Sequence, residues 1–322
     1  MKKVLFVVST LQKSGPIEVL LNTVKSLNRY RYDPIILTLS KKPKNSQINA
    51  FQKLGVKIEF LNTKRLNVLF LMVLLMQRIE KLSPDVIHSH GFRANFFLAL
   101  INKRIMHIAT IHNNSYLDYT YVYGKLGQLM AVIYMAVIRI IPICSGCSKN
   151  VSEICEDKIN KQTINIQNGV NTSDFSSVNT KTKQKFRKQL NLPVTTKHYP
   201  IHPRARKPIQ GFATKIPNNI SVIEPLGYLD MMALIHPSDS VFTDSGGLQK
   251  EAFFLNKKCV TLRDTTEWVE TIALGMNTLG LNATGEVQFN TIQAFLSESK
   301  VAHAMTPYGK GNAAEKIVAC LL

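Results

Sequence analysis

The stretch that constrains this chain most is a glycine turn set between a short apolar run and a helix start. Residues 239–242 form the run, Thr243–Glu251 contain the turn with Gly246 and Gly247, and residues 252–255 are apolar again. This order predicts a strand, a tight turn and a helix. Two glycines let the backbone come close to a ligand, and the N–H groups of a helix's first turn favour an anion.

The side chains around this turn suit a nucleoside diphosphate. Ser245 adds a hydroxyl donor for the same anion. Glu251, about one and a half turns into the helix, can accept from two vicinal hydroxyls such as those of a ribose. A plain turn before a helix remains the alternative interpretation on spacing alone.

The charge divides the chain into two differently built parts. Residues 1–197 hold 29 Lys and Arg against 10 Asp and Glu, a net of +19, whereas residues 198–322 hold 11 of each, a net of zero. A basic part attracts polyanions such as nucleic acid, an anionic membrane or a phosphorylated lipid. Because no basic stripe with interleaved aromatics, zinc-finger spacing or RNA-binding signature is present, we expect no nucleic-acid partner.

Two apolar stretches in the basic part favour a membrane surface over nucleic acid. They are residues 66–76 and 129–143, and each is too short to span a bilayer. Buried helices are the plain interpretation, and docking at a membrane interface is the alternative.

The five cysteines form no pairing framework, which indicates a reducing, cytoplasmic setting. Cys144 and Cys147 have C-x-x-C spacing, but Cys155 alone does not complete a zinc site, so we expect free thiols and no metal. The N-terminal run Val4–Val8 is too short for a signal peptide and predicts a first strand.

Apolar runs alternate with helical patterns along both parts, which predicts a parallel α/β sheet in each. The expected strands are 4–8, 34–39, 56–61, 85–88, 106–112, 140–145, 163–166, 220–223, 239–242 and 259–262. The expected helices are 17–27, 46–54, 68–82, 148–156, 183–190, 229–235, 268–274 and 313–322. Ligands bind at the carboxyl ends of parallel strands. His88, His90 and His112 lie at such ends, as candidates for phosphate contacts or proton transfer, or as structural residues.

Four motifs give the first part a family resemblance: Ser14-Gly15-Pro16 with its helix, residues 84–91, residues 110–113, and residues 168–171 followed by Phe175. With them, residues 1–197 resemble the N-terminal domain of GT-B glycosyltransferases of family 4. In that family this domain binds the acceptor, often a lipid-linked one. The resemblance implies that Gly15 lies near the donor phosphates and that His112 is the family's histidine beside the sugar, our candidate catalytic residue.

The second part carries motifs of a different family. They are residues 202–207, 224–228, 243–251, 263–270 and 307–311. With them, residues 198–322 resemble the C-terminal domain of non-hydrolysing UDP-N-acetylglucosamine 2-epimerases. The resemblance implies that Ser245 and Gly246, with Gly247, hold the UDP diphosphate, that Glu251 holds the ribose, and that Met231 lies near the uracil. Arg204 and Arg263 are expected to supply positive charge or to brace the cleft.

Two features depart from the epimerase pattern. Epimerisation moves a proton at C2 of the sugar, which needs acid and base groups. The family places carboxylates at strand ends where this chain has residues 88–91 and 111–114, which contain no Asp or Glu. The interval 197–202 also leaves no room for an opening strand and helix, so nucleotide binding is expected to be weakened.

The resulting fold prediction is α/β and GT-B-like. It has two Rossmann-like domains facing a cleft, 1–197 and 198–322, the second truncated at its start. Three functions compete. They are a retaining, metal-independent UDP-sugar glycosyltransferase of bacterial surface polysaccharide synthesis, a 2-epimerase, and a UDP-sugar-binding fusion remnant without catalysis. We expect a UDP-sugar as substrate, no cofactor, and a lipid-linked acceptor at the inner face of the membrane for the transferase. The oligomeric state stays open, with a homodimer among the alternatives.

Overall fold

The computed structural model describes residues 1–61, 68–101, 104–113, 115–166, 197–201, 215–298 and 313–320, together with residues 205, 209, 211 and 308. The chain divides into two compact units. The first comprises residues 1–170 with 304–322, and the second comprises residues 171–303. The predicted turn at 168–171 and the predicted helix at 183–190 lie outside the described residues.

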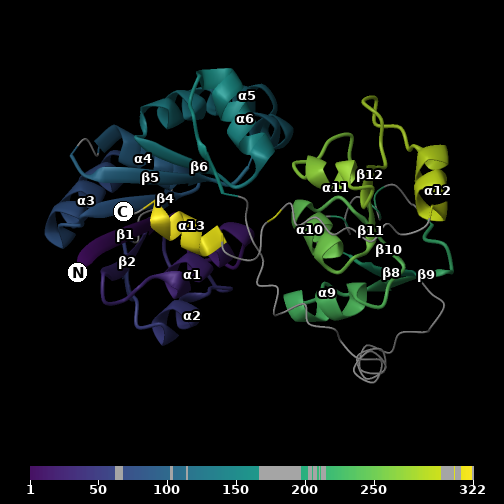
Figure 1. Ribbon diagram of the computed structural model, residues 1–322, viewed down its shortest axis with the longest axis horizontal. Coiled ribbons are helices and arrows are strands. Elements are labelled where there is room, and N and C mark those ends of the chain that lie inside the picture. Colours follow the sequence, from purple (N-terminus) through teal and green to yellow (C-terminus); the bar gives the residue numbers. More distant parts are fainter. Residues whose placement is uncertain are drawn as a thin grey trace. The chain divides into compact units, whose positions relative to one another are not determined.

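The first unit is built on the alternation that the sequence predicts (Figure 1). Its strands are β1 Lys2–Val8, β2 Tyr32–Thr38, β3 Lys57–Phe60, β4 Val86–His90, β5 Met106–Ile111, β6 Ile143–Gly146 and β7 Ile164–Asn165. Its helices are α1 Gly15–Ser26, α2 Ile48–Lys53, α3 Val68–Leu82, α4 Phe92–Ile101, α5 Ser115–Ile140, α6 Lys149–Ile159 and α13 Ala313–Ala319. The strands run parallel in the order β3-β2-β1-β4-β5-β6-β7.

Strand β1 shows why its sequence is a continuous apolar run. Its alternate residues point to opposite faces of the sheet, and both faces are covered. Val4 and Phe6 pack with α1 and α2, whereas Leu5 and Val7 pack with α3 and α4. Sequence order and register therefore place the carboxyl ends of β1, β4, β5 and β6 at one edge of the sheet.

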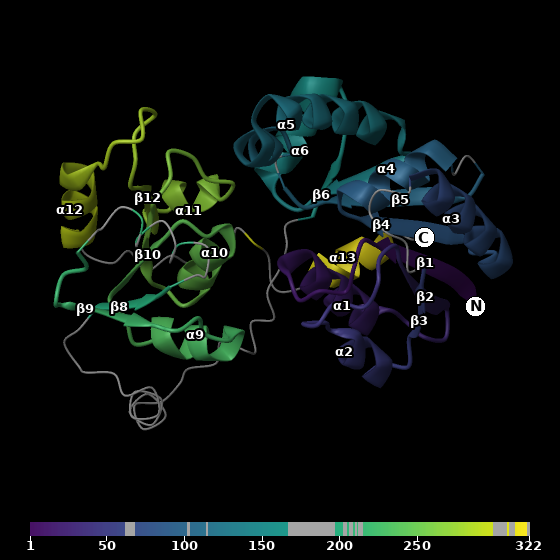
Figure 2. The same ribbon diagram turned by 180° about the vertical axis from the view of Figure 1, so that it is seen from behind.

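The last helix belongs to the first unit, not to the second domain in which the sequence analysis placed residues 313–322. Helix α13 lies beside α1 in both views (Figures 1 and 2). Val318 and Cys320 pack against the core cluster that holds α1. An apolar helical pattern at the end of a chain does not say which core it covers, because α13 packs against α1, which is far away in sequence.

The second unit contains two parallel sheets, β8-β9 and β10-β11-β12. The strands are β8 Lys197–Pro200, β9 Ile220–Ile223, β10 Ser240–Thr243, β11 Lys258–Thr261 and β12 Asn277–Leu279. The helices are α9 Tyr228–Ile235, α10 Gly246–Phe254, α11 Val269–Ala273 and α12 Phe289–Ser297. Strand β8 corrects one expectation: residues 197–200, where no opening strand was expected, form one and pair with β9.

Two helices differ most from their predictions. Helix α4 was not predicted, because it packs with α3 on one side and α5 on the other, and its apolar residues lie around the helix and not along one face. Helix α5 begins at Ser115, well before the predicted start at residue 129, and is interrupted by left-handed Gly124 (φ 58°). Its segment Tyr123–Ile140 is long and apolar enough to cross a membrane, a test that core helices of soluble proteins also pass.

Candidate functional site

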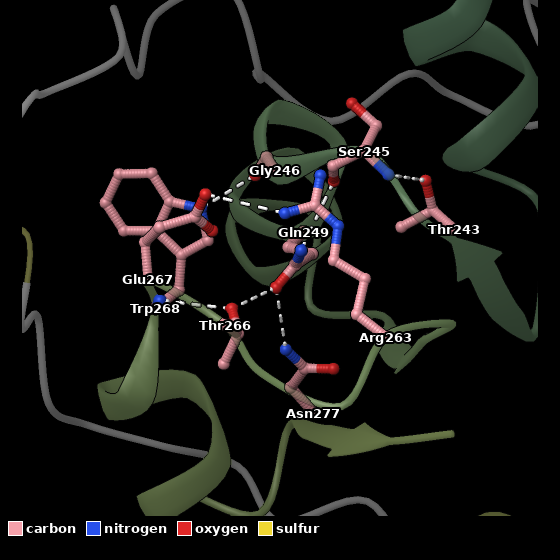
Figure 3. Close-up of polar contacts among 9 residues, drawn as sticks. All are labelled: Thr243, Ser245, Gly246, Gln249, Arg263, Thr266, Glu267, Trp268 and Asn277. Carbon is pink, nitrogen blue, oxygen red and sulfur yellow. Dashed lines mark hydrogen bonds and ion pairs between the residues drawn. The ribbon is translucent and has the colours of Figure 1, made fainter. Parts of the chain in front are cut away.

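The predicted strand, turn and helix form around Ser245, as Figure 3 shows. Ser245 is the N-cap residue of α10, and its backbone N–H donates to Thr243 Oγ1 at 3.0 Å. Its hydroxyl does not cap the helix, although serine in this position commonly does so. Ser245 is exposed, and its hydroxyl group lies at the start of α10 without capping the helix.

The two glycines that follow are not required by the local backbone. Neither Gly246 nor Gly247 has a positive φ. A Cβ built on Gly246 would lie 3.6 Å from the Glu267 carboxylate oxygens, and one on Gly247 would lie 4.0 Å from Ser245 Oγ. Both are ordinary contacts. The absence of side chains here is explained better by the close approach of a ligand than by folding.

A set of buried polar side chains braces this turn (Figure 3). Gln249 is 1% exposed, and its Oε1 accepts from Thr266 Oγ1 at 2.5 Å and from Asn277 Nδ2 at 3.3 Å. Trp268 Nε1 donates to the Gly246 carbonyl at 2.7 Å. The loop after β11 is therefore tied to the first turn of α10 by side-chain hydrogen bonds. The sequence analysis missed this network, because its partners lie up to 28 residues apart.

Arg263 reaches the same region from the end of β11. Its Nη1 lies 3.5 Å from Glu267 Oε1, and both side chains are partly exposed. Glu267 is thus the ion-pair partner of Arg263. Because the pair is long and open to water, we attribute little stability to it. The guanidinium lies near the turn (Figure 3).

Glu251 lies in the second turn of α10 and is partly buried. Burial raises the pKa of its carboxyl to about 7. Near pH 7 the ionised and the protonated form of Glu251 are therefore both populated. An ionised carboxylate accepts hydrogen bonds from hydroxyls and a protonated one also donates, so both forms suit a diol.

The other predicted binding residues have different positions. Met231 lies on α9 and packs against the cluster that contains Val241 and Ala252. Arg204 lies outside the described residues. Gly15 is the first residue of α1 in the first unit, with nothing within 4 Å of where a Cβ would stand. The structure thus gathers Ser245, Gly246, Gly247 and Arg263 at one turn, whereas Gly15 belongs to the other unit.

In the first unit the strand-end histidines form a group, in which His88 and His90 are buried and His112 is partly buried. His90 Nδ1 lies 3.0 Å from His112 Nε2, and the two rings are stacked. His88 Nε2 lies 2.8 Å from Thr110 Oγ1. Burial lowers the pKa of His112 to about 4 and that of His88 to about 3, so both imidazoles are neutral at pH 7. They can exchange hydrogen bonds with a ligand but bring no positive charge to a phosphate.

One nitrogen of each of these histidines lacks a hydrogen-bond partner within the described part of the chain. They are His88 Nδ1, His90 Nε2 and His112 Nδ1. A buried polar atom without a partner is costly, so this group is suited to bind a polar ligand or water. The cysteines of the same unit offer no such chemistry. Cys144 and Cys155 are free, buried in the apolar cluster below α5, and burial raises their pKa to about 12 and about 11.

Fold and sites together define a two-unit α/β protein with a glycine turn at the start of α10 in the second unit and a histidine group in the first. Residues 15–174 match the family model described as "Glycosyltransferase Family 4". Residues 178–322 match the one described as "UDP-N-acetylglucosamine 2-epimerase". The first part of the chain is thus similar to one family and the second part to another, as the motifs predict.

Individual relatives confirm the second half of this description. A UDP-N-acetylglucosamine 2-epimerase homolog of Methanococcus maripaludis is 42% identical over 127 residues, which is 38% of this chain and 35% of the relative. A UDP-2,3-diacetamido-2,3-dideoxy-D-glucuronate 2-epimerase of Pseudomonas aeruginosa is 47% identical over 91 residues, 28% of this chain and 25% of the relative. The matches span about a third or less of the length of these curated relatives.

Solved structures resemble the whole chain in fold. The UDP-GlcNAc 2-epimerase of Neisseria meningitidis, solved bound to UDP-GlcNAc, aligns over 99% of both chains with a TM-score of 0.65 and 19% identity. A UDP-N-acetylglucosamine 2-epimerase structure from Listeria monocytogenes aligns over 100% of this chain and 96% of that one, with a TM-score of 0.68 and 18% identity. The predicted GT-B-like α/β fold is confirmed.

Proposed function

We propose that this protein binds the UDP part of a UDP-N-acetylhexosamine at the start of α10 and acts on the sugar as a 2-epimerase. One observation carries the binding part. The first turn of α10 presents an uncommitted Ser245 hydroxyl beside two glycines that the fold itself does not need. Such a turn accepts a diphosphate, because its N–H groups and the helix dipole favour negative charge.

The neighbouring side chains support this assignment. Arg263 lies near the turn and brings a positive charge for a phosphate oxygen. Glu251, on the same helix, offers a carboxyl group for the ribose hydroxyls. Met231 on α9 is the candidate neighbour of the uracil. These three residues lie within the part that matches the epimerase family, and relatives of this part are named as 2-epimerases.

The proposed reaction needs a group that removes the C2 proton and one that returns a proton on the opposite face. Residues 88–91 and 111–113 of the first unit contain no carboxylate. Its candidate groups are the imidazoles of His90 and His112, which are unprotonated at neutral pH. A reaction through them would differ from the carboxylate chemistry that the family resemblance implies.

Deuterium exchange tests the proposed reaction directly. The purified protein is incubated with UDP-N-acetylglucosamine in D2O, and the C2 proton of the sugar is followed by NMR. Because the returning proton comes from solvent, we expect this signal to disappear as deuterium enters C2. A C2 proton that stays unchanged while UDP binding is measurable would contradict epimerisation and leave binding alone.

Glycosyl transfer is the second candidate, and two observations in the first unit favour it. Residues 15–174 match family 4 of the glycosyltransferases. The outer side of α5 is apolar: Leu126, Leu129, Val132 and Ile140 are between 56% and 62% exposed. An exposed apolar face on a strongly basic part suits the surface of an anionic membrane, where a lipid-linked acceptor would be found. In this candidate function His112 contacts the sugar, and the protein works at the inner face of the membrane.

An acceptor requirement separates the two candidates. A transferase releases UDP from UDP-N-acetylglucosamine at a rate that rises when membrane lipid extract is added. An epimerase exchanges the C2 proton without any acceptor. UDP binding with neither reaction would identify a binding protein without catalysis.

A further inference from the structure

We propose that Trp268 is a positioning residue of the nucleotide site, which fixes the direction of the Gly247 N–H by holding the carbonyl of Gly246. This inference rests on the proposed function, because it assigns Trp268 a role in UDP binding. The indole Nε1–H donates to the Gly246 carbonyl at 2.7 Å. In a planar trans peptide the C=O of one residue and the N–H of the next point in opposite directions. Fixing the Gly246 oxygen therefore also fixes the Gly247 N–H on the far side of the same peptide.

The glycines explain why such a contact is needed. A peptide between two glycines has wide conformational freedom and loses more entropy when it is ordered than other peptides do. A diphosphate site gains affinity when its donors are already aimed before binding. A hydrogen bond from outside the helix supplies this preorganisation to Gly246 and Gly247 without placing a side chain where the ligand approaches.

Trp268 is itself held from several directions. Its backbone N–H donates to Thr266 Oγ1 at 3.1 Å, and its carbonyl accepts from Thr271 Oγ1 at 2.7 Å. The Lys250 ammonium lies 4.5 Å from the centroid of the ring, and both residues are buried. The cation–π contact keeps the face of the indole against α10, so the Nε1–H stays directed at Gly246.

The same contacts close a ring around the helix start (Figure 3). The Thr266 hydroxyl that accepts from Trp268 donates to Gln249 Oε1 at 2.5 Å. Gln249 Nε2 in turn donates to the Ser245 carbonyl at 3.4 Å. Gln249 thus holds the carbonyl of the Ser245–Gly246 peptide, and Trp268 holds the carbonyl of the Gly246–Gly247 peptide. Their N–H groups, those of Gly246 and Gly247, are the ones assigned to the diphosphate.

Trp268 also provides its own assay, because it is the single tryptophan of the chain. Its emission therefore comes from one ring, which is hydrogen-bonded to the proposed site. Titration of the unmodified protein with UDP is expected to change this emission, with a midpoint equal to the Kd from calorimetry. A residue that merely stabilises the fold would not respond to the nucleotide in this way.

The decisive variant is Trp268→Phe, which keeps an aromatic face for Lys250 and removes the N–H donor. We expect its UDP affinity in calorimetry to fall about tenfold, the effect of one hydrogen bond. Combined with Gly247→Ala, which acts on the same peptide, the two losses are expected to be non-additive. Phe295→Leu is the matched control, because Phe295 is a buried aromatic ring 4.6 Å from the ammonium of Lys258 in the same unit. It is expected to lower the unfolding temperature and leave UDP affinity unchanged.

The outcomes separate this inference from the function on which it rests. Unchanged Trp268 emission during UDP binding, or an unchanged affinity of Trp268→Phe, would overturn the positioning role and leave UDP binding intact. If calorimetry detects no UDP binding to the unmodified protein, the proposed function fails and the role of Trp268 fails with it.

Discussion

His90 Nδ1 and His112 Nε2 lie 3.0 Å apart at the carboxyl edge of the first sheet, and burial holds the pKa of both imidazoles below the ordinary value. His107 and His88 are lowered in the same way, to about 4 and about 3. In the unfolded chain these groups titrate near pH 6.5. Between about pH 6.5 and the lowered pKa values, the folded first unit therefore binds fewer protons than its unfolded form.

We predict that acid destabilises the first unit. Stability from these histidines is fully present above pH 6.5 and is lost as the pH falls toward their folded pKa values. The free energy of unfolding falls by up to about 1.4 kcal/mol per pH unit for each histidine. Urea unfolding followed by circular dichroism at pH 7 and pH 5 measures this effect. His107→Gln, which removes one of the four groups, should reduce the difference between the two pH values. An equal difference in the variant would contradict the prediction.

Glu251 gives the second unit the opposite pH dependence. Its pKa is raised to about 7 in the folded state, so its contribution to stability is fully present below pH 4.5 and is lost as the pH rises through 7. Glu251→Gln, which has the same shape and no charge, should be more stable than the unmodified protein at pH 8. This advantage should shrink at pH 5, where the carboxyl group of Glu251 is protonated in the folded protein. Urea unfolding followed by Trp268 emission reports the second unit and tests this.

The same variant tests the ribose assignment. Glu251→Gln removes the strong acceptor for the ribose diol, and we expect its UDP affinity at pH 8 to fall on the order of tenfold. Affinity for inorganic pyrophosphate, which has no ribose, is the control and should not change. If both affinities fall equally, Glu251 acts on the turn as a whole and not on the ribose.

The exposed face of α5 leads to a prediction about membranes. The unmodified protein should sediment with vesicles that contain anionic lipid, and the bound fraction should fall with added salt. Leu129→Glu places a charge on the apolar face, at a residue that is 56% exposed, and should reduce binding about tenfold without loss of fold. Gln128→Glu adds the same charge at an exposed polar neighbour. Equal binding of both variants would exclude α5 as the contact.

Elements that depend on neighbouring residues in the sequence could be predicted, whereas those that depend on contacts between distant residues could not. Strands such as β1 and β9 follow from local apolar runs, and the turn before α10 follows from its place between an apolar run and a helix start. All three were predicted within a few residues. Helix α4 was missed, since a helix packed between α3 and α5 shows no amphipathic period. The return of α13 to the first unit was missed too, because packing against α1 leaves no local signal.

The candidate site divides in the same way. Ser245, Gly246 and Glu251 could be named from spacing, since they belong to one turn and one helix. The roles of Gln249, Trp268 and Asn277 depend on hydrogen bonds between separate elements. The pairing of His90 with His112 joins two strand ends that are 22 residues apart. These contacts are properties of the folded chain, and spacing does not reveal them.

Gly247→Ala gives the most direct test of the central claim, that the start of α10 binds the UDP diphosphate. A Cβ at this position meets only an ordinary contact, 4.0 Å from Ser245 Oγ, and alanine favours a helix over glycine by up to about 1 kcal/mol. The fold should therefore be unchanged or slightly more stable. UDP titrated into the unmodified protein and into this variant by calorimetry should show binding to the first and a loss of at least about tenfold in the second, because the methyl group occupies the space of a close phosphate. Equal affinity of the two proteins would contradict the account.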